Sequence, residues 1–213
     1  AMIGKDAFQE SDIIGMANPV VKYAFQPRTP GEVPEMVKKG FYIAETGRPG
    51  PVLIDVPKDV QQNESPMEFP EEFKIQGYHP WYDPDMVACE KAIEMLLNSE
   101  KPIILAGGGT IISSAFAELQ SIAETLMIPV VTTFKGKGAF PENHPLSLGP
   151  IGMHGHAEAN KMMAEADCVL AIGTRFSDRS VGTFEAFEKR LKIIHMDVDP
   201  AEIGKNQTTS LAV

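Results

Sequence analysis

Uninterrupted apolar runs recur in the second half of the chain, and each ends at glycine or polar residues. The clearest run covers residues 168–172, Cys-Val-Leu-Ala-Ile, and stops at Gly173. Such a run is typical of a strand that is covered on both faces inside a parallel sheet. Similar runs predict further strands over residues 102–106, 129–133 and 192–196.

Segments with helical periodicity separate these strands. They predict helices over residues 85–98, 113–126, 156–165 and 184–191. In the first helix, the apolar positions expected to face inward are Val87, Ile93, Leu96 and Leu97. Residues 141–150 show no such pattern and are expected to be irregular.

Strands that alternate with helices predict an α/β fold with a doubly wound, mostly parallel, Rossmann-like sheet over residues 83–213. The predicted strands end near residues 107, 133, 173 and 197. In an open α/β sheet, ligands bind outside the carboxyl ends of the strands. A ligand site is therefore expected along the edge that these strand ends share.

The first 62 residues predict an incomplete α/β unit in front of this sheet. It consists of a strand at 22–25, a helix at 32–46 and a strand at 51–57. Thr29 is the expected N-cap of the helix, and Phe41 is among the residues expected on its inward face.

Residues 63–82 carry several prolines and acids without periodicity, and this composition predicts a linker. Trp81 and Tyr82 offer aromatic side chains that would pin the linker to a neighbouring surface.

Composition narrows the class of protein. The 213 residues are 43% hydrophobic and 23% charged, with a formal net charge of −10, which argues against binding to nucleic acid. No apolar run approaches the roughly 20 residues of a membrane span, and the first residues lack the apolar core of a signal peptide. We therefore expect a cytoplasmic protein without a membrane segment, in which Cys89 and Cys168 are reduced core cysteines.

Two glycine-bearing stretches are candidate ligand contacts. Residues 107–109 are three glycines after a strand, a pattern that suits either a phosphate or a plain turn. Residues 152–155, Gly-Met-His-Gly, would let the main chain pass a flat ligand and offer it the soft side chain of Met153. Because no second His or Cys stands at ligand spacing beside His154, no metal site is expected there.

Charged residues follow the last two strands of the predicted sheet. Arg175 and Arg179 would address one phosphate or carboxylate if a helix starts there; the alternative is an ion-pair ladder with Asp178 and Glu185. Asp197 is placed to accept hydrogen bonds from sugar hydroxyls. The residues alone support a nucleotide-like ligand and specify no reaction.

Several motifs then occur in a fixed order, at residues 7–10, 47–61, 152–155, 173–179 and 199–206. Together they resemble the acetolactate synthase (acetohydroxyacid synthase) large-subunit family of thiamine diphosphate enzymes, over essentially the whole chain. The resemblance implies that residues 1–62 match the second half of a domain that binds the thiamine pyrimidine. Residues 63–82 would be a linker, and residues 83–213 would form a central FAD-binding domain.

The resemblance also implies a reaction and its partners. The family condenses two 2-ketoacids with decarboxylation to 2-acetolactate or 2-aceto-2-hydroxybutyrate, for branched-chain amino-acid synthesis. It uses thiamine diphosphate, Mg²⁺ and FAD, forms homodimers or homotetramers, and in some members binds a small regulatory subunit. The sequence is expected to be a piece of such a transferase that is inactive alone. The alternatives are a pyruvate oxidase, another 2-ketoacid decarboxylase, or a non-catalytic nucleotide-binding module.

Site residues follow from the resemblance position by position. Gln9, Lys58 and Arg179 match catalytic positions, Arg179 being the one that orients the carboxylate of the second ketoacid; Phe8 and Met153 match the substrate channel. The positions that match FAD contacts are Arg48, Gly107, Gly108, Thr133, Phe134, Lys135, Ile151, Gly152, Met153, His154, Gly173, Thr174, Arg175, Arg179, Asp197 and Val198.

Overall fold

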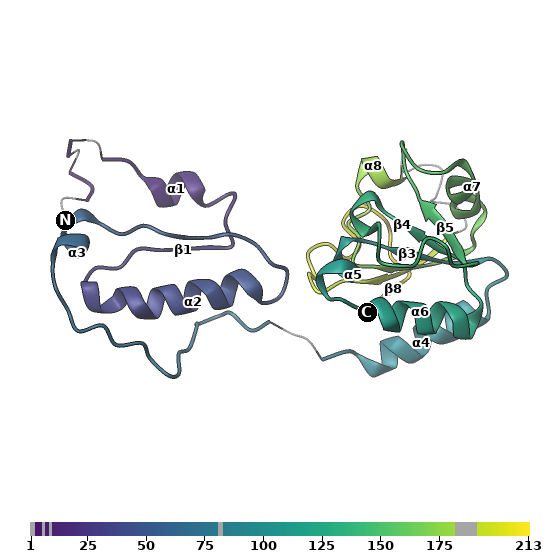
Figure 1. Ribbon diagram of the computed structural model, residues 1–213, viewed down its shortest axis with the longest axis horizontal. Helices are drawn as coiled ribbons and strands as arrows, with labels where there is room; N and C mark the ends of the chain where they lie inside the picture. The colour runs from purple at the N-terminus through teal and green to yellow at the C-terminus, as the bar shows by residue number, and fades with distance from the viewer. Residues whose placement is uncertain (1–2, 6, 9, 81–82, 182–190) are drawn as a thin grey trace. The chain divides into compact units, whose positions relative to one another are not determined.

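The computed structural model describes residues 3–5, 7–8, 10–80, 83–181 and 191–213. Gln9, Trp81, Tyr82 and most of the helix expected at 184–191 therefore lie outside the described residues. The chain divides into two compact units, a first unit of residues 1–82 and a second unit of residues 83–213 (Figure 1).

A parallel sheet forms the centre of the second unit. Its strands are β3 (Pro102–Ala106), β4 (Val130–Thr132), β5 (Ser147–Pro150), β6 (Cys168–Ile172), β7 (Lys192–Met196) and β8 (Leu211–Ala212). Their spatial order is β5-β4-β3-β6-β7-β8, and every pair is parallel. Numbered from β3, this is the order 3-2-1-4-5-6 of a doubly wound sheet, so the predicted fold class is confirmed.

Helices cover both faces of this sheet. Helices α4 (Met86–Leu97) and α6 (Phe116–Leu126) lie on one face, and α7 (Ala157–Glu165) lies on the other (Figure 1). In β3, Ile104 packs with the first two helices and Leu105 with α7. Both faces of each central strand are thus buried, which is why these strands appear in the sequence as continuous apolar runs.

Helix α4 faces the sheet with different residues from those expected. Its buried positions are Ala88, Ala92 and Leu96, whereas Val87 and Leu97 are 58% and 66% exposed. Of the predicted inward residues, only Leu96 is buried; Ile93 is exposed as well. Two sides of this helix carry apolar residues, so the sequence alone did not show which side faces the sheet. The side that does so carries the small residues Ala88 and Ala92.

The predicted helix at 113–126 is wrong at its start. The structure has a short helix α5 (Gly108–Ile112), a break, and then α6. The break falls at Ser114, whose φ of 55° is left-handed and cannot continue a helix. Gly108 and Gly109, for which either a phosphate contact or a plain turn was expected, are the first two residues of α5.

Two edge strands of the sheet, β5 and β8, were not predicted from the sequence. Strand β5 lies in the segment expected to be irregular, and β8 was not predicted. Gly149 in β5 has a φ of 80°, and the register shifts between Val130 and Val131 of its neighbour. Short edge strands of this kind lack the apolar run that marks a buried strand.

Asp167 connects the starts of β3 and β6. Its carboxylate accepts the N–H groups of Glu100 (2.8 Å) and Lys101 (2.9 Å), and its own N–H donates to the Lys101 carbonyl (3.2 Å). Burial acts to raise the pKa of this carboxyl, but the two backbone donors lower it more, and the pKa lies below its ordinary value. Asp167 is therefore held as a carboxylate.

The first unit is a βαβ arrangement with short additional helices. Strands β1 (Tyr23–Phe25) and β2 (Val52–Ile54) pair in parallel, and α2 (Val33–Glu45) connects them through the 3₁₀ turn η1 (Pro30–Glu32). Helices α1 (Ile13–Ala17) and α3 (Lys58–Gln62) complete it.

Two details of this unit differ from expectation. Phe41 is 66% exposed; the buried residues of α2 are Pro34, Gly40 and Ile43, and the sheet beside α2 has two strands among the described residues. The Thr29 side chain makes no cap bond to the backbone; its hydroxyl instead donates to Glu32 (3.2 Å), which also accepts the Arg28 N–H (2.9 Å).

The segment after α3 is held along α2. We call residues 70–78 the strap. Lys38 of α2 donates to the carbonyls of Pro70 (2.5 Å) and Glu71 (3.1 Å), and Tyr78 hydrogen-bonds the Thr46 carbonyl (3.0 Å). Lys22 donates to the Tyr78 hydroxyl (3.2 Å) and to the Thr46 carbonyl (2.7 Å). The strap has no helix or strand over its length, yet side chains on α2 and beside β1 fix it at both ends.

Candidate functional site

The strand ends meet at one edge of the second unit's sheet, as expected. Past the end of β4, the Thr133 N–H donates to the Ala106 carbonyl (3.0 Å). The Gly107 N–H donates to the Ile172 carbonyl (2.8 Å), and the Gly173 N–H donates to the Met196 carbonyl (2.8 Å). The segments that follow β3, β4, β6 and β7 thus begin side by side.

Between β3 and β6 the chain connections leave in opposite directions, which makes this the switch point of the sheet. Here the main chains cross in contact: the Gly109 N–H donates to the Gly173 carbonyl (3.0 Å). A Cβ on Gly107 would lie 2.2 Å from the Gly173 oxygen, and one on Gly173 would lie 2.5 Å from the Gly109 Cα. The packing of two turns therefore requires these glycines, and the N–H groups of Gly107 and Gly109 are already bonded.

The Gly-Met-His-Gly stretch lies against the residues that follow β6. The Met153 N–H donates to the Arg179 carbonyl (3.4 Å), and a Cβ on Gly152 would lie 2.4 Å from the same oxygen. Asn160 of α7 holds Gly152 with two bonds, its Oδ1 accepting from the Gly152 N–H (2.9 Å) and its Nδ2 donating to the Gly152 carbonyl (3.1 Å). Sequence analysis missed Asn160; a polar side chain on the second turn of the following helix was the available signal.

The two arginines are arranged differently from the simplest expectation. Helix α8 (Asp178–Val181) contains Arg179, whereas Arg175 precedes it. Arg179 Nε lies 3.7 Å from Asp178 Oδ2, and both side chains are more than 70% exposed, so this ion pair is weak and leaves the guanidinium accessible. Part of the alternative ion-pair ladder is therefore present; Glu185 lies outside the described residues.

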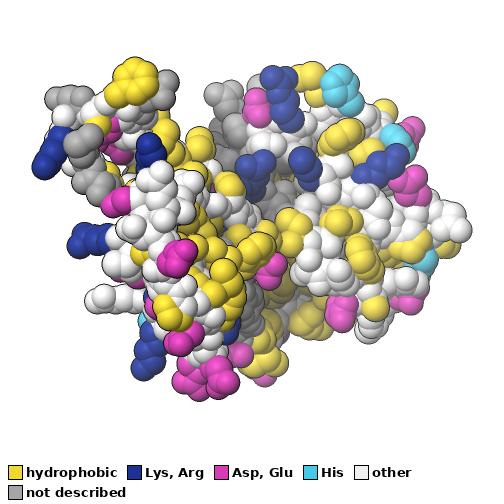
Figure 2. Space-filling model, turned by 60° about the vertical axis from the view of Figure 1, so that its left-hand side comes forward, with side chains coloured by type: hydrophobic (Ala, Val, Ile, Leu, Met, Phe, Trp, Pro, Cys, Tyr) yellow, Lys and Arg dark blue, Asp and Glu magenta, His cyan; other side chains and the backbone are white. Residues whose placement is uncertain are grey.

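The outer surface of this edge combines apolar and cationic side chains. Phe134, Met153 and Val198 are 81%, 67% and 47% exposed. The exposed cations are Lys135, Arg175 and Arg179, on a chain whose formal charge is −10. Figure 2 shows Lys and Arg side chains beside hydrophobic ones on this unit. These apolar and cationic side chains fit a ligand that has both a flat ring and phosphates. FAD, which the sequence resemblance implies, is a ligand of this kind.

The remaining candidates of this edge differ in exposure. Thr133, Ile151 and Thr174 are buried, so their side chains support the edge from below, and His154 is exposed. Asp197 is half-buried, and its Oδ1 accepts the N–H of Asp199 (2.9 Å).

Other predicted site residues belong to the first unit. Phe8 is 93% exposed, and Arg48 and Lys58 are exposed as well. Lys58 is the first residue of α3, and Arg48 follows the left-handed Gly47 (φ 59°). The catalytic candidate Gln9 lies outside the described residues.

Neither cysteine has the environment of a nucleophile. Cys168 is fully buried in β6, where burial and then the charge of Asp167 raise the pKa of its thiol to about 11. Cys89 is half-buried in α4, and both cysteines are free thiols. The expected core position is thus confirmed for Cys168, whereas Cys89 is only partly buried.

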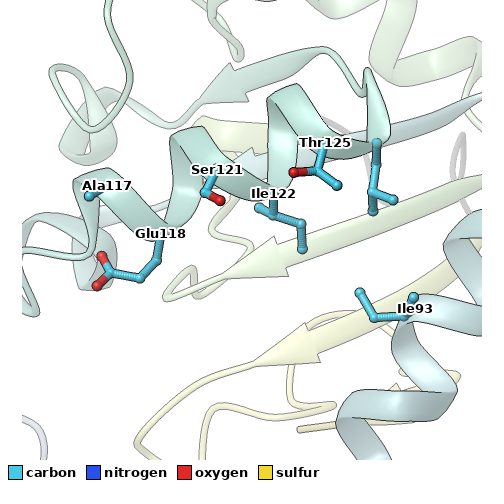
Figure 3. A pocket seen from close by; sticks show the side chains of 7 residues that line it. Ile93, Ala117, Glu118, Ser121, Ile122 and Thr125 are labelled. Carbon is cyan, nitrogen blue, oxygen red and sulfur yellow. The ribbon is translucent and has the colours of Figure 1, made fainter.

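A groove of about 600 Å³ lies between α4 and α6, away from the strand-end edge. Figure 3 shows Ile93 of α4 pointing toward Ile122 of α6, with Ser121 and Thr125 along the same helix. None of the residues that line the groove is a candidate from sequence analysis. No helix among the described residues is long and apolar enough to cross a bilayer.

Known proteins resemble this chain over its full length. Residues 89–213 match the family described as "Thiamine pyrophosphate enzyme, central domain". The chain is 49% identical over 215 residues to the "Probable acetolactate synthase large subunit" of Methanocaldococcus jannaschii, covering 100% of this chain and 36% of that protein. It is 45% identical to the "Acetolactate synthase" of Arthrospira platensis, with 99% and 37% covered.

A third relative, the "Acetolactate synthase large subunit" of Haemophilus influenzae, is 42% identical, with 100% of this chain and 37% of the relative covered. The chain thus spans little more than a third of the length of these relatives. The family match covers more than half of the chain and includes the whole parallel sheet described above. The chain therefore belongs to the thiamine pyrophosphate enzymes, and residues 89–213 are their central domain.

Proposed function

We propose that this chain is part of the large subunit of an acetolactate synthase, a transferase that condenses pyruvate with pyruvate or 2-ketobutyrate. The observation that carries the proposal is the identity of 42–49% to acetolactate synthases over essentially the whole chain. The named activity belongs to proteins almost three times as long, so we assign it to the complete synthase polypeptide and not to these 213 residues alone.

Within that polypeptide we assign separate roles to the two units. Residues 83–213 bind FAD along the strand-end edge, residues 1–62 are the second half of the thiamine-pyrimidine domain, and residues 63–82 connect them. Thiamine diphosphate with Mg²⁺ supplies the carbanion-stabilising chemistry, and FAD has no net redox duty in this condensation.

The residues of the edge suit FAD in two ways. The guanidinium groups of Arg175 and Arg179 and the ammonium of Lys135 address phosphates, and the exposed Phe134 and Met153 offer apolar contact to a ring. Arg179 also has a fork geometry that suits a carboxylate, and we assign it the orientation of the second ketoacid. Phe8, Gln9 and Lys58 would line the substrate channel.

The wider setting is also a proposal. We expect a cytoplasmic enzyme, in keeping with its unpaired cysteines, that works as a homodimer or homotetramer with a possible regulatory subunit. A pyruvate oxidase or another 2-ketoacid decarboxylase is the second candidate, since the matched family is described only as thiamine pyrophosphate enzymes and its description names no substrate.

The test uses the complete synthase. It should purify yellow, with flavin absorbance near ~450 nm, and should release acetolactate from pyruvate with thiamine diphosphate and Mg²⁺. Arg175→Gln should lower flavin content, because it removes a phosphate contact, while Lys91→Gln on the exposed side of α4 should not. A colourless, fully active enzyme would refute FAD binding, and acetaldehyde or acetyl phosphate as the main product would favour the second candidate.

A further inference from the structure

The turn after β6 is held at three successive carbonyl groups. The Gly173 oxygen accepts from the Gly109 N–H (3.0 Å), the Thr174 oxygen from His195 Nε2 (2.8 Å) and the Arg175 oxygen from Asn206 Nδ2 (2.8 Å). The donors come from the start of α5, from β7 and from the segment before β8. Three separate parts of the chain therefore determine the path of one short turn.

This turn has an unfavourable backbone conformation. Gly173 has a φ of 56° and Phe176 a φ of 48°, which is left-handed and rare for a bulky side chain. The Phe176 ring is 2% exposed and packs edge-to-face on His195, with ring centres 5.2 Å apart. Such conformations persist only where the surroundings impose them, and they are frequent at ligand sites.

His195 is a buried polar residue whose side chain makes one hydrogen bond among the described residues, to this turn. Its side chain is 1% exposed, Nε2 donates to the Thr174 carbonyl, and Nδ1 has no partner among the described residues. Because a carbonyl oxygen only accepts, the His195 Nε2 must carry a proton. Burying an imidazole ring in a strand costs desolvation free energy, and the hydrogen bond to the Thr174 carbonyl offsets part of that cost.

Only one side chain of the turn points to solvent. Thr174 and Phe176 are buried, whereas Arg175 is exposed and makes no ion pair among the described residues. The bonds to the carbonyls before and at this residue fix the backbone from which its guanidinium extends. We propose that His195 and Asn206 are positioning residues that hold Arg175 ready for the phosphates of a dinucleotide, FAD in the function proposed above, on which this inference rests.

The test is a double-mutant cycle in the complete synthase, stripped of flavin and titrated with FAD. His195→Met replaces the donor with an apolar side chain that suits the buried site, and Asn206→Asp replaces the donor with an acceptor on an exposed loop. Each should weaken FAD binding about tenfold, since each removes one hydrogen bond to a carbonyl of the turn, at Thr174 or at Arg175. His195→Gln, which restores an amide donor, should stay within about threefold of the wild type.

The cycle separates positioning from a general loss of structure. With Arg175→Gln already present, His195→Met should change FAD affinity by less than about twofold, because the positioned group is gone. Equal losses with and without Arg175 would overturn the proposal, as would normal FAD affinity in both His195→Met and Asn206→Asp. A wild-type synthase that binds no FAD overturns the proposed function too, whereas a flavin-binding wild type with an additive cycle overturns only this inference.

Discussion

At the residue scale, Asp167 offers the sharpest prediction about stability. Asp167→Asn keeps one acceptor and loses the other, so unfolding of the second unit at about pH 7 should become easier by about 1–3 kcal/mol. Because the folded pKa is depressed, the wild-type advantage is present above the unfolded pKa and is lost as the pH falls through the folded one. Urea unfolding at several pH values down to about pH 2 measures this.

Glu165→Gln is the matched control for that substitution. Glu165 pairs with Lys101 at 3.3 Å on the surface, beside the Asp167 bonds, so its loss should cost less than about 0.5 kcal/mol. A pH-independent effect of Asp167→Asn would contradict the assignment of its carboxylate.

Residues that act through backbone carbonyls were the ones that sequence analysis missed. Arg175, Met153 and Gly173 could be predicted as candidates, because charged, soft or glycine residues after a strand have a recognisable pattern. Asn160 and Asn206 lie eight and thirty-one positions from the groups they bond, and no periodicity links such pairs. His195 was hidden within a strand that was otherwise predicted correctly.

At the element scale, the strap leads to a test of what holds residues 70–78. Tyr78→Phe removes the hydroxyl that bonds to Thr46 and Lys22, so hydrogen exchange in the strap and at the end of α2 should be about tenfold faster. Lys74→Ala, at an exposed position of the same segment, should leave exchange unchanged. Equal exchange in the two variants would show that the Tyr78 hydroxyl does not hold the strap.

The success of element prediction depended on burial. Strands β3, β6 and β7 were predicted within their observed bounds, since two covered faces demand apolar residues throughout. Edge strands and the break before α6 depend on local φ values, such as that of Ser114, and on tertiary pairing. These leave little trace in a hydrophobic pattern.

At the scale of the whole molecule, alternation of strands and helices was enough to predict the fold class and the edge at which the strand ends meet. It was not enough to show why the glycines of that edge are there. Gly107, Gly109 and Gly173 cross at the switch point, and this is a property of strand order that becomes visible only when β3 and β6 are placed side by side.

That strand order also has a consequence during synthesis, because the two neighbours of β3 in the sheet are made at different times. Strand β3 can pair with β4 early, but its other partner begins only at Cys168. Until then the second edge of an apolar strand is open to other chains. A chain ending at residue 165 should therefore aggregate when expressed, while residues 1–213 remain dispersed; a monodisperse 1–165 with cooperative unfolding would show that the growing sheet protects its edge by other means. We therefore expect the growing chain to be most prone to aggregation after β4 has been made and before β6 has been made.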